Sequence, residues 1–387
     1  MNKFTFHVLG VPHTKTNLDY TGCAFTMKAW KFCKMMTARG HTVYHYGVEG
    51  SCPDCTENIN VVSKELYDHE YGNMDYKSKW FKYDTGGEVY QTFFKNTIAE
   101  IDKRRRPHDF LLPFWGQGVR PICDAEKDKM LIVEPGIGYP DGGFAPYRVF
   151  ESEAVKNGYY GMQAIKYCQT KNYDRVIPNY FDLDEFYYNN SYSDRVNRAD
   201  PYFAFVGRIY DGKGINIALQ VCEKLGVKLK VAGQLDTSYE NYNWGTAEYV
   251  GYVNSQERSE LMSHAIATFV PSQYTEPFGG VQVEALLCGT PTITSANGAF
   301  CENNIEGVTG YRCVTFDDYL TAALNCLEGK INYAKCRQQG LKFSLENVAP
   351  QYERYFQDIM DLYEGDGWYT IRPETASRIE NLKIKTK

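Results

Sequence analysis

Residues 276–284 read EPFGGVQVE, and they follow an apolar run at 267–271, ATFVP. The run has the length of a buried parallel strand, and a helical pattern begins at Val281, directly after two glycines. Gly279 and Gly280 would then stand at the N-terminus of that helix, where free N–H groups and the helix dipole favour anions. This order of strand, glycine-rich loop and helix predicts a parallel α/β sheet with a ligand site beyond the strand end.

Two carboxylates flank the glycine pair. Glu276 lies in the loop before the helix and Glu284 about one turn inside it, so both can face one site. Carboxylates beside an anion site need cationic or hydroxyl partners, and a sugar and a ribose supply such hydroxyls. A capped surface helix with ordinary acids is the alternative. The glycine pair, Pro277 and the position after a strand favour the binding site.

A second loop of this kind lies upstream. Residues 202–207, YFAFVG, predict a strand, and RIYDGKG follows at 208–214. Arg208 would offer a planar fork to phosphate oxygens and Lys213 a mobile point charge. The glycines allow the backbone to approach a ligand closely. The functional interpretation is a diphosphate clamp, and the alternative is a solvated charged loop.

Short apolar runs alternate with helical patterns along the whole chain, which predicts parallel α/β architecture. The runs fall into two series separated by the polar stretch 182–200, so we expect two doubly wound domains. The pattern at about 351–363 has an apolar face that needs a partner surface, whereas 49–90 is polar, rich in tyrosine and hard to assign. The expected strands are 4–9, 42–46, 110–112, 130–133 and 176–177, then 202–207, 228–232, 248–251, 267–271 and 292–294; the expected helices are 24–39, 215–225, 281–288 and 317–327.

Composition narrows the class of protein. The 387 residues are 43% hydrophobic and 23% charged, as in soluble globular proteins, and suit two or three domains. The net charge of −6 makes nucleic acid an unexpected partner. Apolar runs are too short to span a membrane, and the first ten residues lack the apolar core of a signal peptide, so a cytoplasmic location is expected. The 12 cysteines are then buried free thiols for the most part.

One cluster of possible metal ligands needs weighing. Cys52 and Cys55 form a C-x-x-C, and His41 and His45 lie just upstream. Four such ligands could bind zinc, but the two histidines fall in an expected strand and no second cysteine pair supports the site. A loop with two incidental thiols is the favoured interpretation.

The second half of the chain resembles the GT-B glycosyltransferases, in particular the retaining family 4 group (glycosyl transferases group 1). Ordered sequence blocks carry the likeness over about 200–312. They are FVGR at 205–208 with Lys213, KVAG at 230–233, the stretch from Pro271 to Ala285, GTPTI at 289–293 and, more loosely, EGVTGY at 306–311. RVIPN at 175–179 and DLDEF at 182–186 are similar to the strand and linker that join the two domains in that family.

The resemblance implies two Rossmann-like domains facing across a cleft, with a C-terminal helix crossing back to the first. The first would comprise 1–182, completed by 347–387, and lie on the acceptor side; the second, 183–346, would bind a nucleoside-diphosphate sugar. The implied catalytic residues are Arg208 and Lys213, which would neutralise the departing diphosphate, and Glu276, which would hold hydroxyls of the donor sugar. The further donor-binding residues would be Gly207, Gly251, Tyr252, Val253, Phe278, Gly279, Gly280 and Glu284, the last on the ribose.

The implied activity is hexosyl transfer to a glycan, lipid or other acceptor, with retention and without metal or cofactor. A D-x-D motif grips a metal in the GT-A transferases, but Asp182 and Asp184 fall in the linker pattern, so we treat that match as incidental. A nicotinamide dehydrogenase would need G-x-G-x-x-G after the first strand, which is missing. A non-catalytic nucleotide- or glycan-binding partner subunit is the remaining alternative.

The first domain departs from the family pattern. Only Gly22 remains of a glycine pair that opens the first helix, so Gly22 is expected on the acceptor or phosphate side. A histidine that many members place after a middle strand is missing from VEPGIGY at 133–139. Glu134, or the backbone from Gly136 to Gly138, would take its place near the sugar.

Basic and aromatic residues complete the expectations. Lys28, Lys31 and Lys34 form one helical stripe and 103–106 reads KRRR, and such patches can dock on an anionic membrane or remain simply solvated. Aromatic residues make up 15% of the chain. Sugars stack on aromatic faces, so part of this excess can form aromatic walls in the cleft, although core packing takes most of it. The examples are Tyr139, Tyr147, Phe150, Tyr159, Tyr160, Tyr180, Phe181 and Phe186.

Overall fold

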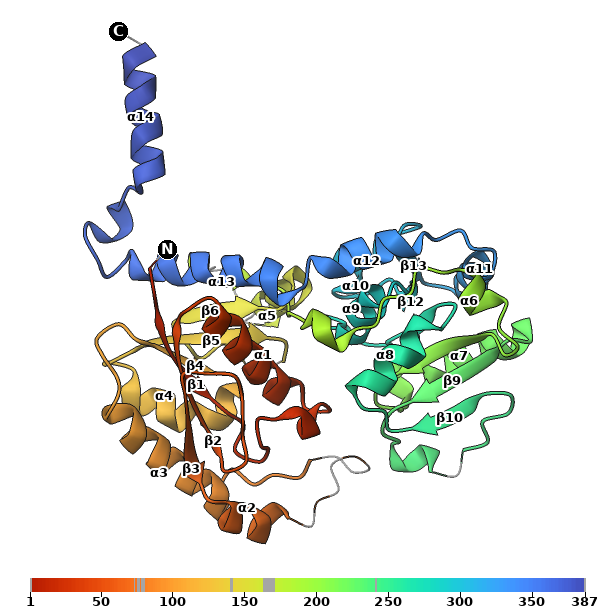
Figure 1. Cartoon of the computed structure of the whole chain (residues 1–387), viewed down its shortest axis with the longest axis horizontal. Coiled ribbons are helices and arrows are strands. Elements are labelled where there is room, and N and C mark those ends of the chain that lie inside the picture. The colour runs from red at the N-terminus through yellow and green to blue at the C-terminus, as the bar shows by residue number, and fades with distance from the viewer. Residues whose placement is uncertain are drawn as a thin grey trace.

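The computed structural model describes residues 2–72, 74, 77, 81–139, 142–162, 171–240 and 242–385. The described residues form two parallel sheets, of seven and six strands, each within its own α/β domain. The two domains lie side by side and are spanned by the C-terminal helices (Figure 1). The prediction of a doubly wound α/β fold in two domains is thereby confirmed.

The first sheet has the strand order β3-β2-β1-β4-β5-β6-β7, and all of its described pairings are parallel. Its order reverses between β1 and β4, so the loops after those strands meet at one edge. Strand β6 and most of the stretch 49–90 could not be assigned from the sequence. The strands are β1 (Thr5–Leu9), β2 (Thr42–Val48), β3 (Glu57–Val62), β4 (Phe110–Pro113), β5 (Leu131–Ile137), β6 (Tyr147–Phe150) and β7 (Arg175–Val176).

The second sheet has the order β10-β9-β8-β11-β12-β13, again parallel throughout. Its order reverses between β8 and β11, the strands that precede the two glycine-containing loops. The strands are β8 (Tyr202–Val206), β9 (Lys228–Ala232), β10 (Glu248–Gly251), β11 (Thr268–Val270), β12 (Thr292–Ser295) and β13 (Gly310–Cys313).

Helices cover both sheets, as the alternating pattern requires. Those of the first domain are α1 (Ala24–Ala38), α2 (Lys64–Tyr71), α3 (Glu88–Asp102), α4 (Arg120–Glu126) and α5 (Glu153–Met162). Those that follow are α6 (Ser193–Val196), α7 (Ile215–Leu225), α8 (Ser255–Ser263), α9 (Gly280–Leu287), α10 (Phe300–Asn303), α11 (Phe316–Leu327) and α12 (Tyr333–Leu341), and the chain closes with α13 (Leu345–Met360) and α14 (Pro373–Lys385).

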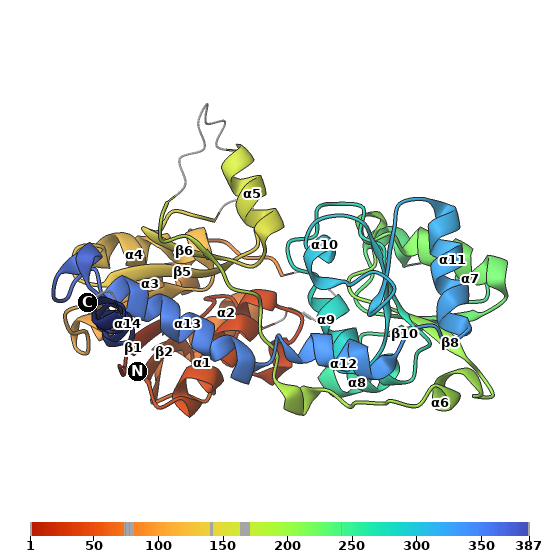
Figure 2. The ribbon, with the colours of Figure 1, turned by 90° about the horizontal axis from the view of Figure 1, so that it is seen from above.

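The chain crosses between the domains at two places that pair with each other. The Phe181 N–H donates to the Phe343 carbonyl at 2.8 Å, and the Leu345 N–H donates to the Phe181 carbonyl at 3.0 Å. Immediately afterwards α13 runs back along the first domain, as Figures 1 and 2 both show. Its apolar face joins the first core, where Tyr352 and Phe356 are buried against residues of β1, β4 and α1.

The C-terminal segment is not one continuous helix. Helix α13 ends at Met360, and α14 extends away from the body of the molecule (Figure 1). Helix α13 begins at Leu345, ahead of the apolar pattern that starts at about residue 351, because the Ser344 hydroxyl caps it by accepting from the Asn347 N–H. Pro350 stands in its second turn.

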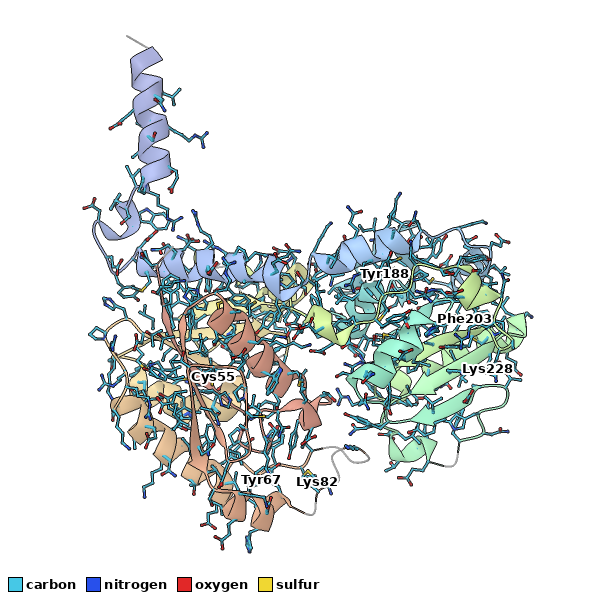
Figure 3. All side chains as sticks on the ribbon, in the orientation of Figure 1. Cys55, Tyr67, Lys82, Tyr188, Phe203 and Lys228 are labelled. Atoms are coloured by element: carbon cyan, nitrogen blue, oxygen red, sulfur yellow. The ribbon has the colours of Figure 1, made fainter. Side chains whose placement is uncertain are left out.

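Each sheet has its own apolar core. Phe203, labelled in Figure 3, is fully buried in the second core together with residues of α7 and α11. Cys55, also labelled, packs against the first core. In the part of the chain that the structure describes, none of the helices has the length and apolar character needed to cross a bilayer.

Candidate functional site

A cleft of about 320 Å³ lies between the domains, beyond the carboxyl ends of β8 and β11. Most residues that the sequence singled out line it. From the second domain these are Gly207, Arg208, Lys213, Tyr252, Val253, Glu276, Gly279, Gly280 and Glu284, and from the first domain Gly22. The described residues that line the cleft do not include Gly251, Phe278, Glu134 or Gly136.

Helix α9 points its N-terminus at the cleft. Gly279, directly before the helix, has a φ of 81°, and a Cβ there would lie 2.5 Å from the Phe300 ring. Glycine is therefore required at this position both by backbone conformation and by space. Phe278 is buried beneath, 5.6 Å from Phe343 between ring centroids, so it supports the helix from the core and is not among the described residues that line the cleft.

Glu276 is held in a fixed orientation at the cleft wall. The Ser272 hydroxyl donates to Oε2 at 2.7 Å, and the Lys213 ammonium lies 3.1 Å from the same oxygen. Glu276 is 8% exposed, so an unpaired carboxylate would be costly here. Oε1 has only a long contact with Lys213, at 3.5 Å, so it can accept further hydrogen bonds more readily than Oε2 can.

The loop after β8 brings its two cations to the same place. Gly214 has a φ of 73°, and a Cβ there would meet the Pro271 carbonyl oxygen at 2.1 Å, so the loop packs tightly on the end of β11. The Lys213 ammonium also lies 4.9 Å from the centre of the Tyr274 ring. Arg208 is exposed and lines the cleft. Two positive charges and the α9 N-terminus thus converge.

Glu284 has a partner that the sequence patterns did not indicate. Its Oε2 lies 3.1 Å from Nε of Arg258, which comes from α8. Both side chains are mostly buried and both line the cleft. Arg258 follows β10 within the first turn of the next helix, so the rule that ligands bind beyond strand ends could have pointed to it.

One side-chain contact closes the cleft at the α1 end. The Thr21 hydroxyl and the Tyr252 hydroxyl lie 2.9 Å apart, joining the two domains. A Cβ at the neighbouring Gly22 would lie 3.9 Å from that tyrosine hydroxyl, which is ordinary contact. Gly251, with a φ of 85°, accepts from the Gly233 N–H at 2.9 Å and so positions Tyr252 from behind.

The lysine stripe of α1 does not form an open basic surface. Lys28 is ion-paired with Glu151 and donates to the Gly136 carbonyl at 2.9 Å. Lys31, 8% exposed, lies 3.6 Å from Glu185. Lys34 contacts Asp182 and lies 3.3 Å from Asp184. The stripe therefore faces the cleft and the interdomain linker, which corrects both sequence-based interpretations, a membrane-docking patch and a solvated helix face.

The basic cluster at 103–106 is similarly engaged. Arg104 bonds Glu57 at 2.6 Å and Glu100 at 2.5 Å, and Lys103 contacts Glu100 at 2.5 Å. Arg105 lies 2.9 Å from Asp102. These pairs cancel most of the local positive charge, so the cluster gives little support to an anionic membrane partner.

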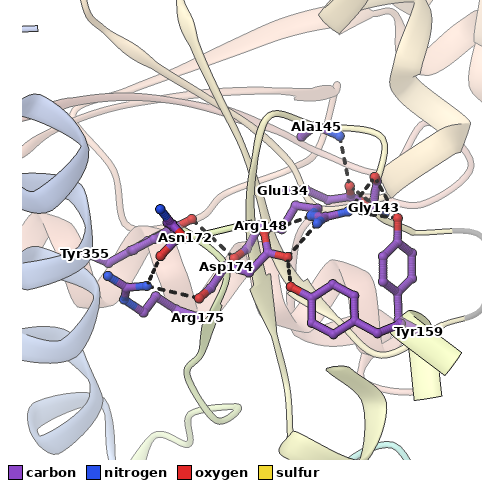
Figure 4. Close-up of polar contacts among 10 residues, drawn as sticks. Glu134, Gly143, Ala145, Arg148, Tyr159, Asn172, Asp174, Arg175 and Tyr355 are labelled. Carbon is purple, nitrogen blue, oxygen red and sulfur yellow. Dashed lines mark hydrogen bonds and ion pairs between the residues drawn. The ribbon is translucent and has the colours of Figure 1, made fainter. Parts of the chain in front are cut away.

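Glu134 was expected near the donor sugar, but it does not line the cleft. Its carboxylate instead binds groups of its own domain. It is fully buried and accepts from the Tyr139 hydroxyl at 3.0 Å. It also accepts from the Gly143 N–H at 2.8 Å (Figure 4). Burial raises the pKa of this carboxyl, and those donors oppose the shift. The carboxylate thus folds the segment after β5 back on itself. Gly136, which has a φ of 68°, presents its carbonyl to Lys28.

The candidate zinc ligands point to other partners. His45 bonds Asn58 at 2.7 Å and Thr16 at 3.0 Å, and His41 bonds Glu353 at 3.0 Å. Burial lowers the pKa of His45 to about 4, so its ring is neutral at physiological pH. Asp182 caps the turn 183–185 and pairs with Lys34. Among the described residues, no group of three or more histidine, cysteine or acidic side chains is placed to hold a metal ion.

Comparisons with known proteins agree with this geometry. Residues 190–343 match the family model "Glycosyl transferases group 1". Glycogen synthase of Mycobacterium tuberculosis is 33% identical over 125 residues, which cover 29% of this chain and 30% of that protein. D-inositol 3-phosphate glycosyltransferase of Mycobacterium marinum is 32% identical over 166 residues, 38% of this chain and 36% of that protein. The chain thus matches about a third of the length of these curated relatives.

Solved structures extend the likeness to both domains. Sucrose-phosphate synthase from Thermosynechococcus elongatus superposes with a TM-score of 0.67 at 17% identity, over 92% of this chain and 99% of that one. HepE of Anabaena, solved in complex with UDP and glucose, gives a TM-score of 0.63 at 15% identity, over 92% and 99%.

The two facing sheets, the α9 N-terminus and the crossing C-terminal helix define a protein of the GT-B fold. Within this fold, residues 190–343 match the family of glycosyl transferases group 1. The resemblance drawn from the sequence blocks is therefore confirmed.

Proposed function

We propose that the protein is a glycosyltransferase that moves a sugar from a nucleoside diphosphate to an acceptor in the cleft. One observation carries the proposal: two cations, the N-terminus of α9 and two oriented carboxylates converge on one cleft between the domains. The family match and the relatives named as glycogen synthase and D-inositol 3-phosphate glycosyltransferase support it.

The second domain holds the donor in this proposal. Arg208, Lys213 and the N–H groups at Gly279 and Gly280 bind the diphosphate, whose negative charge grows as the bond to the sugar breaks. Groups already in place when charge develops lower the barrier without reorganising. Lys213 is kept at the site by Glu276 before the donor arrives, 3.1 Å away, so little ordering is needed on binding.

The carboxylates recognise hydroxyls. Glu284, oriented by Arg258, binds the ribose, and Glu276, oriented by Ser272, binds the donor sugar. Tyr252 and Val253, which line the cleft, contact the base in this proposal. We propose a uridine base because the HepE complex holds UDP. Transfer with retention and without a metal remains part of the proposal.

A donor screen tests the proposal. The full chain is mixed with UDP-, GDP- and ADP-sugars, its melting temperature is followed, and release of free sugar is measured with and without a chelator. We expect stabilisation and slow chelator-insensitive hydrolysis with one base. Glu284→Gln should lose most of the stabilisation, whereas Glu223→Gln, an exposed position on α7, should keep it.

The same screen distinguishes a glycosyltransferase from the non-catalytic alternative. A non-catalytic partner subunit would be stabilised by a nucleotide or glycan but would neither hydrolyse the donor nor transfer its sugar to any acceptor. The departure of the first domain from the family pattern is what keeps this alternative in view. No stabilisation by any nucleotide sugar would refute both.

A further inference from the structure

The loop that carries Glu276 is held by hydrogen bonds to its backbone carbonyls. The Ala299 N–H donates to the Glu276 carbonyl at 2.9 Å. The Asn303 side-chain amide donates to the Phe278 carbonyl, also at 2.9 Å. Ala299 directly precedes α10 and Asn303 ends it, so these two carbonyls are fixed from within the second domain.

The carbonyl between them takes its hydrogen bond from the other domain. The Ser152 hydroxyl, in the link between β6 and α5, donates to the Pro277 carbonyl at 2.6 Å. The same oxygen accepts from the Val155 N–H at 3.1 Å, as the side chain of a helix N-cap does. A hydroxyl has one proton, and Ser152, which is 2% exposed, gives it to Pro277. The first domain thereby contacts the backbone directly beside Glu276.

A second interdomain contact lies next to this one. The Glu302 carboxylate, on α10, accepts from the Glu153 N–H at 2.9 Å and from the Ala154 N–H at 2.8 Å, one with each oxygen. These N–H groups open α5 and have no partner within the helix, and the helix dipole favours a carboxylate there. Helices α5 and α10 thus face each other across the domain boundary (Figure 2). Glu302 is exposed, so this contact contributes less than the buried one.

The segment 151–154 is itself anchored in the first domain. The Glu151 N–H donates to the Ile137 carbonyl at 3.1 Å, and its carboxylate is paired with Lys28, which lines the cleft. Glu151 is 5% exposed, so the segment is packed as well as bonded. Since it belongs to one domain and the loop at Pro277 to the other, the Ser152–Pro277 bond exists only while the domains are together.

We infer that Ser152 is a positioning residue for Glu276, because its hydroxyl fixes the donor loop to the first domain, and that Glu302 reinforces this link. The effect on turnover rests on the proposed function; the hold on the loop does not. Ser152 is not among the described residues that line the cleft, and it acts through the backbone next to Glu276. The geometry of the loop is then complete only when both domains are in place. A small displacement of a group that contacts substrate is costly for the reaction, so this link affects the rate.

Hydrogen exchange followed by mass spectrometry tests the hold on the loop, with the full chain and without donor. In Ser152→Ala, amides of the stretch 276–283 should exchange about tenfold faster, as the loss of one buried hydrogen bond would give. Ser152→Thr keeps the hydroxyl and should restore the slower exchange. Ser63→Ala is the matched control, because Ser63 caps α2 by accepting from the Leu66 N–H at 3.2 Å. It removes a helix cap of the same kind and should leave exchange of the loop unchanged.

Turnover of the nucleotide sugar selected in the donor screen measures the consequence. In Ser152→Ala, kcat should fall about tenfold while the donor KM changes less than about twofold, because Arg208 and Glu284 bind the donor from outside this loop. Ser152→Thr should recover kcat. Glu302→Gln, at an exposed position, should lower kcat about twofold and provides a second variant should Ser152→Ala fail to fold. Glu223→Gln is its control and should keep kcat.

The two measurements distinguish the inference from the proposed function. If no nucleotide sugar is turned over by the wild-type chain, the proposed function fails, and exchange of the loop still decides whether Ser152 holds it. The melting temperature of each variant reports folding. Unchanged loop exchange in Ser152→Ala, an equal rise in Ser63→Ala, or a normal kcat of Ser152→Ala beside an active wild type overturns the inference.

Discussion

The two sheets share an order of strands but organise charge differently at their carboxyl edges. In the second domain Lys213 and Glu276 come from neighbouring loops after β8 and β11, and Arg208 is exposed in the cleft. In the first domain Lys28 is paired with Glu151, 123 residues away, and is nearly buried. The second edge thus places an exposed arginine beside the Lys213–Glu276 pair, whereas the Lys28–Glu151 pair of the first edge is nearly buried. One fold can therefore expose a cation at one sheet edge and bury an ion pair at the other.

Removing a cation from the second edge should have the largest effect. Lys213→Ala takes away charge that we propose stabilises the departing diphosphate, so turnover should fall about 10²- to 10³-fold, as for other preorganised charge-stabilising groups. Donor hydrolysis or transfer with the full chain measures this. Lys224→Ala, on the exposed face of α7, is the matched control and should retain activity. Lys213→Ala with normal turnover would remove the distinction between the two edges.

The second domain also depends on a buried cation away from the cleft. The Arg195 guanidinium is fully buried and donates to the carbonyls of Ala265 and Asn189 at 2.6 and 2.7 Å and to the Thr290 hydroxyl at 2.7 Å. Arg195→Met should cost about 3 kcal/mol of unfolding free energy, because several buried acceptors lose their donor at once.

Denaturant unfolding followed by two probes checks this prediction and sharpens the comparison. In Arg195→Met, the unfolding midpoint of the second domain should shift to a lower urea concentration. The first domain, whose core does not contain Arg195, should keep its midpoint. Arg198→Met, at an exposed position nearby, should shift neither. A loss spread equally over both domains would mean that they unfold as one unit.

Two adjacent glycines allow a finer test of the α9 N-terminus. Gly279→Ala places a Cβ at a φ of 81° and 2.5 Å from the Phe300 ring, so we expect a loss of about 2 kcal/mol. Gly280→Ala meets only Phe181, at 3.9 Å, and should leave stability within about 0.5 kcal/mol. Thermal unfolding of both variants gives the difference. Equal melting temperatures would show that the position before the helix is not constrained as the geometry requires.

The sequence allowed the second edge to be predicted far better than the first. Strand, loop and helix follow one another within 267–288, so local pattern alone placed Gly279, Gly280 and Glu276 at one site. The first edge is assembled from side chains far apart in the chain, such as Lys28 and Glu151, and no local pattern indicates which carboxylate a lysine will meet. Glu134 was misplaced for the same reason: its partners lie in a turn that follows β5, and periodicity does not predict turns of that kind.

The smallest predicted effect concerns the helix that completes the first domain. Glu353, on α13 and 4% exposed, accepts from Arg39 at 2.6 Å and from His41 Nε2 at 3.0 Å. The Phe4 N–H donates to His41 Nδ1 at 3.2 Å, so the neutral ring carries its proton on Nε2, as the bond to Glu353 requires. Burial alone would raise the pKa of Glu353, but the donors outweigh it and hold the pKa below its ordinary value of 4.5.

The sign of the resulting pH dependence follows from that depressed pKa. A carboxyl whose pKa is lower in the folded state stabilises the fold above its unfolded pKa of 4.5, and this contribution is lost as the pH falls through the folded value. Burial also lowers the pKa of His41, so the unfolded chain takes up that proton first as the pH falls below 6.5, with the same sign. Glu353→Gln should therefore cost about 1 kcal/mol at neutral pH and flatten the acid limb of stability, whereas Glu364→Gln, exposed beyond α13, should do neither. Urea unfolding across this pH range measures both curves, and an acid limb unchanged in Glu353→Gln would show that the docking of α13 does not depend on this carboxylate.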